Sequence, residues 1–173
     1  MSDISGSTVI PTEFGTGLTI GQIAALHPVE YNSAIDYNGP RIFMENGYLT
    51  TPRFFFISRL DDMVEITLVD GKKLKARKTQ KVLTSSGFTQ IQHLKPQMPI
   101  GVVGDFFNYS CLTPTNVEPV VDITKHLEYM DKQVHIKMVP ISARKAVEGK
   151  EPGFSFGIPY YMRYIANGIV CHD

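Results

Sequence analysis

The sequence predicts an all-β fold, and two observations support this. The 14 glycines and 11 prolines are spread along the whole length of 173 residues, and the short runs between them are rich in β-branched and aromatic side chains. Short runs of this composition between turn residues are typical of many short strands. A chain of this length forms about one domain around one core.

The expected strands, in chain order, are Val9–Ile10, Leu18–Ile20, Arg41–Phe43, Phe54–Ser58, Met63–Val69, Lys72–Ala76, Ile100–Val103, Val117–Ile123, Val134–Met138 and Tyr164–Val170. The clearest turn is Asp70-Gly71, because this pair readily adopts the positive φ that a tight hairpin needs. Asn38-Gly39 and Asn46-Gly47 indicate weaker turns of the same kind.

Two further segments are expected to differ from strands. Helix is predicted only as a minor component, from Thr19 through Leu26, where Thr19 is the expected cap and Pro28 ends the segment. The stretch from Ala143 to Pro159 is rich in Lys, Glu, Gly and Pro and has no periodicity. It predicts an exposed loop, and a candidate site for a split or an insertion.

Charge and hydropathy exclude several classes of function. Lys plus Arg and Asp plus Glu both number 17, so the formal net charge is +0, and no long run of one sign occurs. Nucleic acid and membranes are therefore not expected partners. No apolar run approaches the ~20 residues of a membrane span, and Met1–Thr12 lacks the pattern of an export signal. The expected location is the cytoplasm.

The two cysteines, Cys111 and Cys171, are too few for a disulfide framework, and no Cys or His cluster has metal-ligand spacing. We expect no metal and no other cofactor, and a reducing compartment is the simpler interpretation. A single Cys111–Cys171 bridge stays open, because the sequence does not supply the Cα separation that a disulfide requires.

Three segments carry a more specific pattern. The last nine residues read Ile165-Ala166-Asn167-Gly168-Ile169-Val170-Cys171-His172-Asp173. Near the start, the chain reads Asp3-Ile4-Ser5-Gly6-Ser7-Thr8-Val9-Ile10-Pro11-Thr12. The third segment runs from Asp70 to Phe88, contains Arg77-Lys78-Thr79-Gln80-Lys81-Val82-Leu83-Thr84, and is followed by Ile91, Leu94 and Ile100.

Together, and in this order, the three segments resemble inteins. Inteins open with a Cys or Ser nucleophile before a small-residue turn, hold a TxxH motif before "-VLT" and a Gly-aromatic turn, and close with an "ANGI-V" strand that delivers a His-Asn pair. His172 keeps the penultimate His. Asp3 stands at the nucleophile position, Arg77 at the Thr, Gln80 at the His of the middle motif and Asp173 at the terminal Asn.

The resemblance implies one domain of the hedgehog/intein (Hint) superfamily over residues 3–173, a mini-intein without a homing endonuclease. Residues 1–2 would be a tag or the remnant of a preceding segment. The implied architecture is an all-β horseshoe of short antiparallel strands with a pseudo-two-fold arrangement and one or two short helices, with Asp3 and Asp173 close together at its centre. The implied partners are the flanking extein segments of a host protein, and a complementary half if the parent is split; we expect a monomer.

The resemblance assigns the catalytic positions to Asp3, Arg77, Gln80, His172 and Asp173. Splicing begins with an acyl shift onto the first side chain, and a carboxylate is a poor nucleophile, so Asp3 is either an inactivated nucleophile or a solvated terminal residue. Gln80 and Arg77 can orient a carbonyl without acting as acid or base, or else lie in an exposed polar turn. His172 suits proton transfer. Asp173 could close a ring only by carboxyl attack, which should be slower than the amide route of Asn.

Other residues carry weaker interpretations. His135 lies near where many inteins keep a catalytic Asp, and Met162 falls where many keep a further His. Cys111 and Cys171 are each either a substitute nucleophile or a buried hydrophobic residue. Three serines carry hydroxyl groups that could substitute for the nucleophile, but none of them matches the first position of the motif: Ser2, Ser5 and Ser7. We expect three histidines to be structural or exposed: His27, His93 and His126.

Three hypotheses for function follow. The first is an autocatalytic splicing domain that excises itself and ligates its exteins, in an inactivated or degenerate form. The second is a Hint-fold domain without catalysis that serves as a structural or interaction module. The third, a cysteine hydrolase that uses Cys111 or Cys171, has only residue types in its favour.

Overall fold

The computed structural model describes residues 3–14, 17–45, 49–103, 136–158 and 162–173. The fold is all-β, as the sequence predicts. Its strands are β1 (Ile4–Ser5), β2 (Val9–Pro11), β3 (Gly17–Thr19), β4 (Ile35–Asp36), β5 (Ile42–Phe43), β6 (Leu49–Thr50), β7 (Phe54–Leu68), β8 (Lys73–Ala76), β9 (Lys81–Thr84), β10 (Gly87–Gln90), β11 (Pro99–Val102), β12 (Lys137–Gly157), β13 (Arg163–Ala166) and β14 (Ile169–His172). The helical elements are α1 (Ile20–Ala24) and the 3-10 turn η1 (Ile91–His93).

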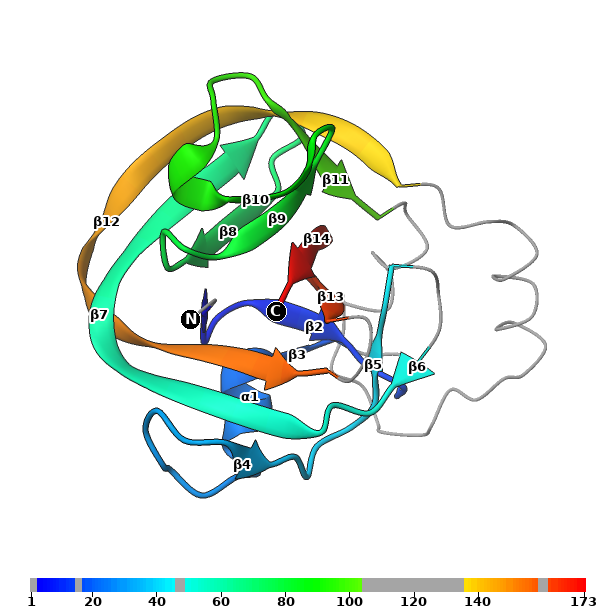
Figure 1. Ribbon diagram of the computed structural model, residues 1–173, viewed down its shortest axis with the longest axis vertical. Coiled ribbons are helices and arrows are strands. Elements are labelled where there is room, and N and C mark those ends of the chain that lie inside the picture. The colour runs from blue at the N-terminus through cyan, green and yellow to red at the C-terminus, as the bar shows by residue number, and fades with distance from the viewer. Residues whose placement is uncertain (1–2, 15–16, 46–48, 104–135, 159–161) are drawn as a thin grey trace.

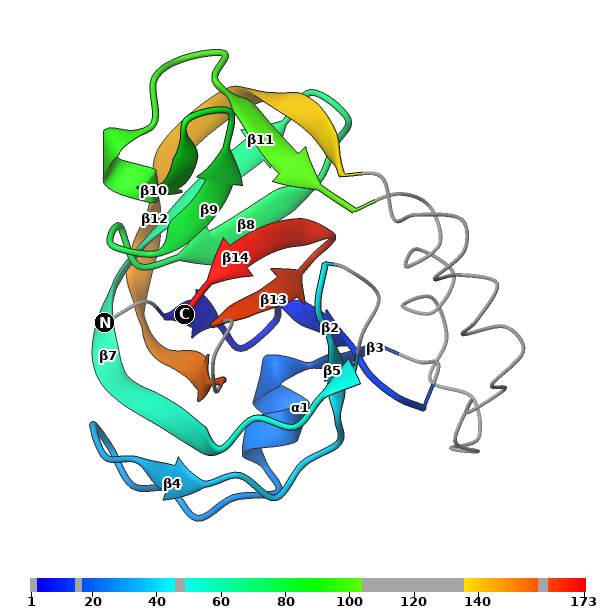
Figure 2. The same ribbon diagram turned by 45° about the vertical axis from the view of Figure 1, so that its right-hand side comes forward.

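The two longest strands, β7 and β12, pair antiparallel and curve together around one side of the molecule (Figure 1). Their register runs from Phe54 opposite Gly157 to Leu68 opposite Ile141. Within the sheet the strand order is β10-β9-β14-β11-β12-β1-β8-β7-β4, and β13 pairs with β14. Inside the curve lie β1, β2, β13 and β14, so both ends of the chain reach the middle of the fold (Figure 2).

The β7 strand corrects the prediction of separate strands at Phe54–Ser58 and Met63–Val69. One strand runs through both segments, and the intervening residues 59–62 are exposed. The pairing with β12 shifts register between Ala146 and Lys150 and again between Glu151 and Gly153, opposite this polar stretch. Register shifts of this kind bend a strand and strengthen its twist without ending it.

The prediction of an exposed loop from Ala143 to Pro159 is wrong. Residues up to Gly157 belong to β12, and residues 142–146 and 148–150 are exposed. A strand with water on both faces shows no apolar alternation, and alternation is the signal by which strands are predicted. The polar composition therefore indicated exposure correctly for most of residues 143–150, but residues 153–156 are buried and the backbone is a strand.

The predicted strand Tyr164–Val170 is instead a tight hairpin of β13 and β14. Asn167 and Gly168 form its turn with φ of 51° and 80°, which fits a two-residue type I′ loop. The Asn167 side chain also accepts from the Val9 backbone N–H at 2.7 Å and donates to the Lys73 carbonyl at 2.8 Å. The turn thereby links the end of the chain to β2 and β8.

The predicted hairpin and helix are confirmed. Gly71 has a φ of 92° between β7 and β8, and the Lys72 N–H donates to the Asp70 side chain at 3.0 Å. Thr19 caps α1 and forms a capping box with Gln22. No helix of the described residues is long and apolar enough to cross a membrane. The predicted strand Val117–Ile123 lies outside the described residues.

An aromatic cluster connects the core to the C-terminal hairpin. His27 stacks on Phe55 with ring centroids 4.8 Å apart, Phe55 meets Phe156 at 5.6 Å, and Phe156 meets Tyr164 at 5.5 Å. The His27 Nε2 accepts from the Asn38 N–H and its Nδ1 lies 2.8 Å from the Ile23 carbonyl. His27 is thus a structural residue, as expected from its sequence context.

We expect Phe55→Ala to lower the free energy of unfolding by about 3–5 kcal/mol, because it removes a fully buried ring from this cluster and leaves a cavity. Leu60→Ala on the same strand is the matched control: Leu60 is 65% exposed, so the change should stay within about 0.5 kcal/mol. Urea unfolding followed by circular dichroism measures both. Equal losses in the two variants would contradict the assignment of the core.

Candidate functional site

The fold brings the two ends of the chain to one place. Asp3 precedes β1, whose Ile4 lies between Phe154 of β12 and Ala76 of β8. Asp173 follows β14, and the Asp3 carboxylate contributes to raising the pKa of the Asp173 carboxyl group. Such a Coulombic effect requires the two carboxyl groups to lie near each other.

Asp3 is buried, with 3% of its surface exposed. Its carbonyl oxygen accepts from the Arg77 backbone N–H at 2.8 Å, while its Oδ1 is buried and has no hydrogen-bond partner. A Cβ added at Gly153 would lie 2.5 Å from the Asp3 Cβ, so only a glycine lets β12 pass this close. A solvated terminal residue does not fit this environment.

Arg77 is buried, and its guanidinium is engaged in cross-linking the strands. One terminal nitrogen donates to the Asp61 carbonyl at 2.6 Å and to the Asp62 carbonyl at 3.2 Å. The other donates to the carbonyls of Arg59 and Glu151 and to the hydroxyl of Ser58, at 2.8 to 3.1 Å. These acceptors belong to the bend of β7 and to β12, so only the backbone of Arg77 binds Asp3.

A cavity of about 490 Å³ opens beside Asp3. Its lining includes Asp3, Ser58 and Arg77, together with Asp61, Asp62, Lys78 and Thr79. The cavity is therefore polar and carries charges of both signs. Among the described residues, no group of three or more His, Cys, Asp or Glu side chains is arranged to hold a metal ion.

Gln80 is fully buried and binds the C-terminal strand. Its Nε2 donates to the His172 carbonyl and to the Lys81 carbonyl, both at 3.0 Å. Its Oε1 lies 3.4 Å from the Tyr164 hydroxyl, which donates to it. The exposed-turn interpretation therefore fails for both Gln80 and Arg77, which are buried, although Lys78 between them is exposed. Within the described part of the chain, no hydrogen bond joins Gln80 to Asp3.

His172 is half-buried and faces the last residue. Its Nδ1 lies 2.6 Å from the Asp173 backbone oxygen. The imidazole also packs against Phe88 with ring centroids 4.9 Å apart and planes at 57°. Pairing of β14 with β9 and β13 at His172 fixes its backbone, so the ring has both a backbone anchor and a packing surface.

Asp173 has a pKa raised to about 6. Burial is the largest cause, and the Asp3 carboxylate adds to it, while a hydrogen bond from the Ile158 backbone lowers the pKa. The Asp173 N–H donates to the Met162 carbonyl at 2.6 Å. The final residue is therefore held through both its backbone and its side chain.

Sequence reasoning missed Tyr164 as a member of this site. Its hydroxyl is fully buried, and its pKa is raised well above the usual range by burial and then by Cys171, Asp173 and Asp3. The available signal was a hydroxyl on the aromatic residue three positions before Asn167, and an aromatic residue there is typical of an ordinary core position in a strand.

The structure does not support a catalytic role for several of the weaker candidates. Cys171 is a buried free thiol whose pKa burial raises, and such a thiol is a poor nucleophile. The Ser5 hydroxyl donates to the Glu151 side chain, and Met162 is exposed. Cys111, His126 and His135 lie outside the described residues.

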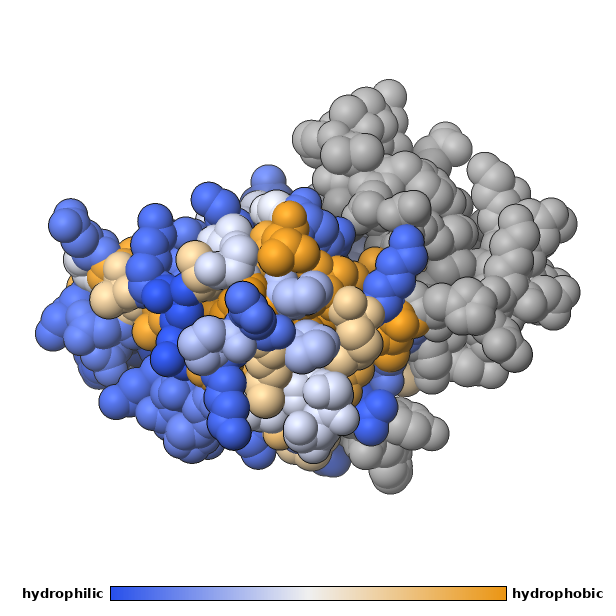
Figure 3. All heavy atoms as spheres, turned by 90° about the horizontal axis from the view of Figure 1, so that it is seen from above, coloured by the Kyte–Doolittle hydropathy of each residue, from blue (hydrophilic) through white to orange (hydrophobic). Residues whose placement is uncertain are grey.

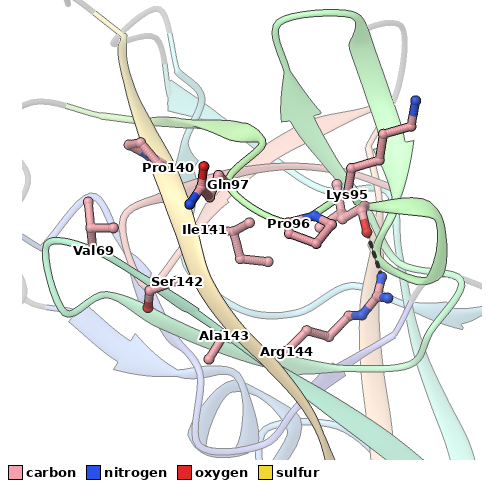
Figure 4. A pocket seen from close by; sticks show the side chains of 10 residues that line it. Val69, Lys95, Pro96, Gln97, Pro140, Ile141, Ser142, Ala143 and Arg144 are labelled. Atoms are coloured by element: carbon pink, nitrogen blue, oxygen red, sulfur yellow. Dashed lines mark hydrogen bonds between the residues drawn. The ribbon is translucent and has the colours of Figure 1, made fainter.

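A second cavity, of about 720 Å³, lies between the segment 94–97 and β12 (Figure 4). Arg144 lines it and donates to the Leu94 carbonyl at 2.8 Å. Seen from above in Figure 3, hydrophobic residues on this face are interleaved with hydrophilic ones. None of Asp3, Arg77, Gln80, His172 and Asp173 lines this cavity, and we do not assign the site to it.

Comparison with known proteins supports the fold. No protein-family model matches the sequence, and no curated protein is significantly similar to it. Among solved structures, a variant of the Ssp DnaB mini-intein is similar with a TM-score of 0.69 at 18% identity, covering 99% of this chain and 93% of that one. A DnaB intein from Synechocystis aligns with a TM-score of 0.68 at 16% identity over 99% and 98% of the two chains.

The TvoVMA intein aligns with a TM-score of 0.72 at 15% identity, over 99% of this chain and 98% of that one. Similarity that spans nearly the whole of both chains at such low identity establishes architecture. Together with the curved β7–β12 pair and the two ends of the chain at the centre, it shows that this protein has the hedgehog/intein fold of the inteins.

Proposed function

We propose that this chain is an intein-like self-processing domain whose first and last positions carry aspartate in place of the residues that splicing uses. The observation that supports the proposal is that both ends of the chain lie inside the curve of β7 and β12 (Figure 2), with Gln80 bound to the carbonyl of His172, the residue before Asp173. A domain that joins its two flanking segments needs both junctions in one site. The flanking extein segments of a host protein are its proposed partners.

The N-terminal half of the site lacks the means for an acyl shift. Asp3 supplies a carboxylate where a hydroxyl or thiol is needed, and the guanidinium of Arg77 is occupied by carbonyls of β7 and β12. The Arg77 backbone N–H donates to the carbonyl of Asp3 itself, whereas an acyl shift acts on the carbonyl of the preceding residue. We therefore propose that the first step is disabled.

A Hint-fold domain without catalysis is the second candidate. The structural use of Arg77 favours it, because the side chain of a middle-motif position now stabilises the bend of β7. A structural module would keep the fold and release neither flanking segment.

The first test places the full chain between two reporter domains. We expect no ligated product from the unmodified chain, because Asp3 cannot accept an acyl group. Asp3→Cys combined with Asp173→Asn should restore ligation or cleavage at both junctions, read from product masses. A folded double variant that leaves both junctions intact would favour the structural module.

The second test concerns Gln80. In the Asp3→Cys, Asp173→Asn background, we expect Gln80→Ala to slow release of the downstream reporter by roughly 10²-fold, as loss of one aligned donor does elsewhere. The physical reason is that its Nε2 holds the His172 carbonyl next to the reacting residue. Gln92→Ala, an exposed glutamine on η1, is the matched control. An unchanged release rate in Gln80→Ala would make Gln80 a core residue only.

The third test concerns Arg77. We expect Arg77→Lys to lower the free energy of unfolding by about 3 kcal/mol, because an ammonium cannot replace a planar group that reaches five acceptors. Lys78→Ala, at the exposed neighbouring position, should change it by less than about 0.5 kcal/mol. In the Asp3→Cys background, thiol-induced cleavage per folded molecule should stay the same. A fall in that rate at full folding would assign Arg77 to the chemistry.

A further inference from the structure

Three Asn-Gly pairs occur in the sequence, and the structure describes two of them in full, Asn38-Gly39 and Asn167-Gly168. An asparagine that precedes glycine loses its side-chain amide when the next backbone nitrogen attacks the side-chain carbonyl carbon, because this attack closes a five-membered ring within the chain. In a folded protein the rate of ring closure depends on how each pair is held. The two described pairs differ in this respect.

The Asn167 side chain is bound by two other strands. Its Oδ1 accepts from the Val9 backbone N–H at 2.7 Å, and its Nδ2 donates to the Lys73 carbonyl at 2.8 Å. The Asn167 N–H also donates to the Val9 carbonyl at 3.0 Å. The side-chain amide would have to leave both partners before the Gly168 nitrogen could reach its carbonyl carbon. The tertiary structure therefore protects Asn167.

Asn38 is held through its backbone. Its N–H donates to Nε2 of the buried His27 at 2.8 Å, while Asn38 itself is exposed. Among the described residues, neither the Asn38 side chain nor the Gly39 N–H has a hydrogen-bond partner. The Asn38 side chain is thus free to rotate toward the Gly39 nitrogen, with water around it.

The packing also determines which residue follows Asn38. A Cβ added at Gly39 would lie 2.6 Å from the Tyr37 hydroxyl oxygen and 2.8 Å from the Cζ of the same ring. The Tyr37 hydroxyl donates to the Pro40 carbonyl at 2.5 Å, so a larger residue at position 39 would displace this contact. The fold therefore requires glycine here, and glycine leaves its nitrogen the least hindered because it has no Cβ.

We propose that Asn38 is a site of spontaneous modification, at which the folded protein converts asparagine to a mixture of aspartate and isoaspartate. The Gly39 nitrogen bonds to the Asn38 Cγ, the Cγ–Nδ2 bond breaks, and the proton of the Gly39 nitrogen leaves with Nδ2 as ammonia. Water then opens the cyclic imide. Opening at Cγ gives aspartate, and opening at the backbone carbonyl gives isoaspartate. The inference does not depend on the proposed function.

Isoaspartate at position 38 would change the contacts of the aromatic cluster. Its backbone runs through the side-chain carbons, so one extra carbon separates the Cα of residue 38 from Gly39, and Pro40 is displaced. Pro40 is buried and binds the Tyr37 hydroxyl, and the Tyr37 ring stacks on His27 with centroids 5.3 Å apart. Loss of one hydrogen bond in this contact should lower Tm by roughly 2–4 °C in a domain of this size.

The experiment incubates the full chain, folded, at mildly alkaline pH and follows each asparagine by mass spectrometry of its peptides. Alkaline pH is chosen because the attacking nitrogen must lose its proton. We expect Asn38 to convert at least roughly tenfold faster than Asn167, because Asn167 must first break two hydrogen bonds. In urea, where the chain is unfolded, the two rates should converge. Methylation by an isoaspartyl methyltransferase identifies the isoaspartate.

Asn38→Gln is the matched control for the effect on stability. It keeps a backbone N–H and a side-chain amide at position 38 but would have to close a six-membered ring, so its Tm should stay constant during an incubation that lowers the Tm of the parent. The inference is overturned if Asn38 stays intact in the folded chain while it converts in urea, or if folded Asn167 converts as fast as Asn38. An equal fall of Tm in the parent and in Asn38→Gln would overturn the effect assigned to isoaspartate.

Discussion

The antiparallel pairing of β7 with β12 is the constraint on which the rest of the structure depends. It joins residues 54–68 to residues 141–157, and therefore sets where every shorter strand can lie. Because β1 pairs with β12 while also meeting β8, the start of the chain is placed inside the curve (Figure 1). A site built from both ends of a chain exists only when such long-range pairing closes the fold.

The bend in this strand pair is stabilised by polar contacts. Where β7 passes through residues 59–62, its register with β12 shifts, and the buried guanidinium of Arg77 binds the backbone carbonyls of Arg59, Asp61 and Asp62. Arginine suits this task because its planar group carries several fixed donors. The side chain of Arg77 is therefore a structural element of the bend.

The two halves of the site differ in what surrounds each aspartate. Asp3 is buried with an oxygen that has no hydrogen-bond partner, which is costly unless the cavity beside it supplies water or a ligand group. Asp173 has a donor at its carboxyl group and another at its carbonyl oxygen. Burial is the main reason why the pKa of Asp173 is raised, and the Asp3 carboxylate adds to it.

Much of the fold and part of the candidate site could be predicted from the sequence. Strand-rich composition, the Asp70-Gly71 hairpin and the Thr19 cap are local signals, because turn and cap geometry depend on a few neighbouring residues, and the structure confirms them. Order and spacing of the three motifs were enough to indicate the intein fold. Tertiary structure alone decided the rest. Residues 143–157 form a strand because β7 supplies their partners, Gln80 is buried because β14 covers it, and the Arg77 guanidinium binds β7 and β12 instead of the first residue. Each of these outcomes depends on contacts between residues far apart in the chain, and no local pattern of residues encodes such contacts.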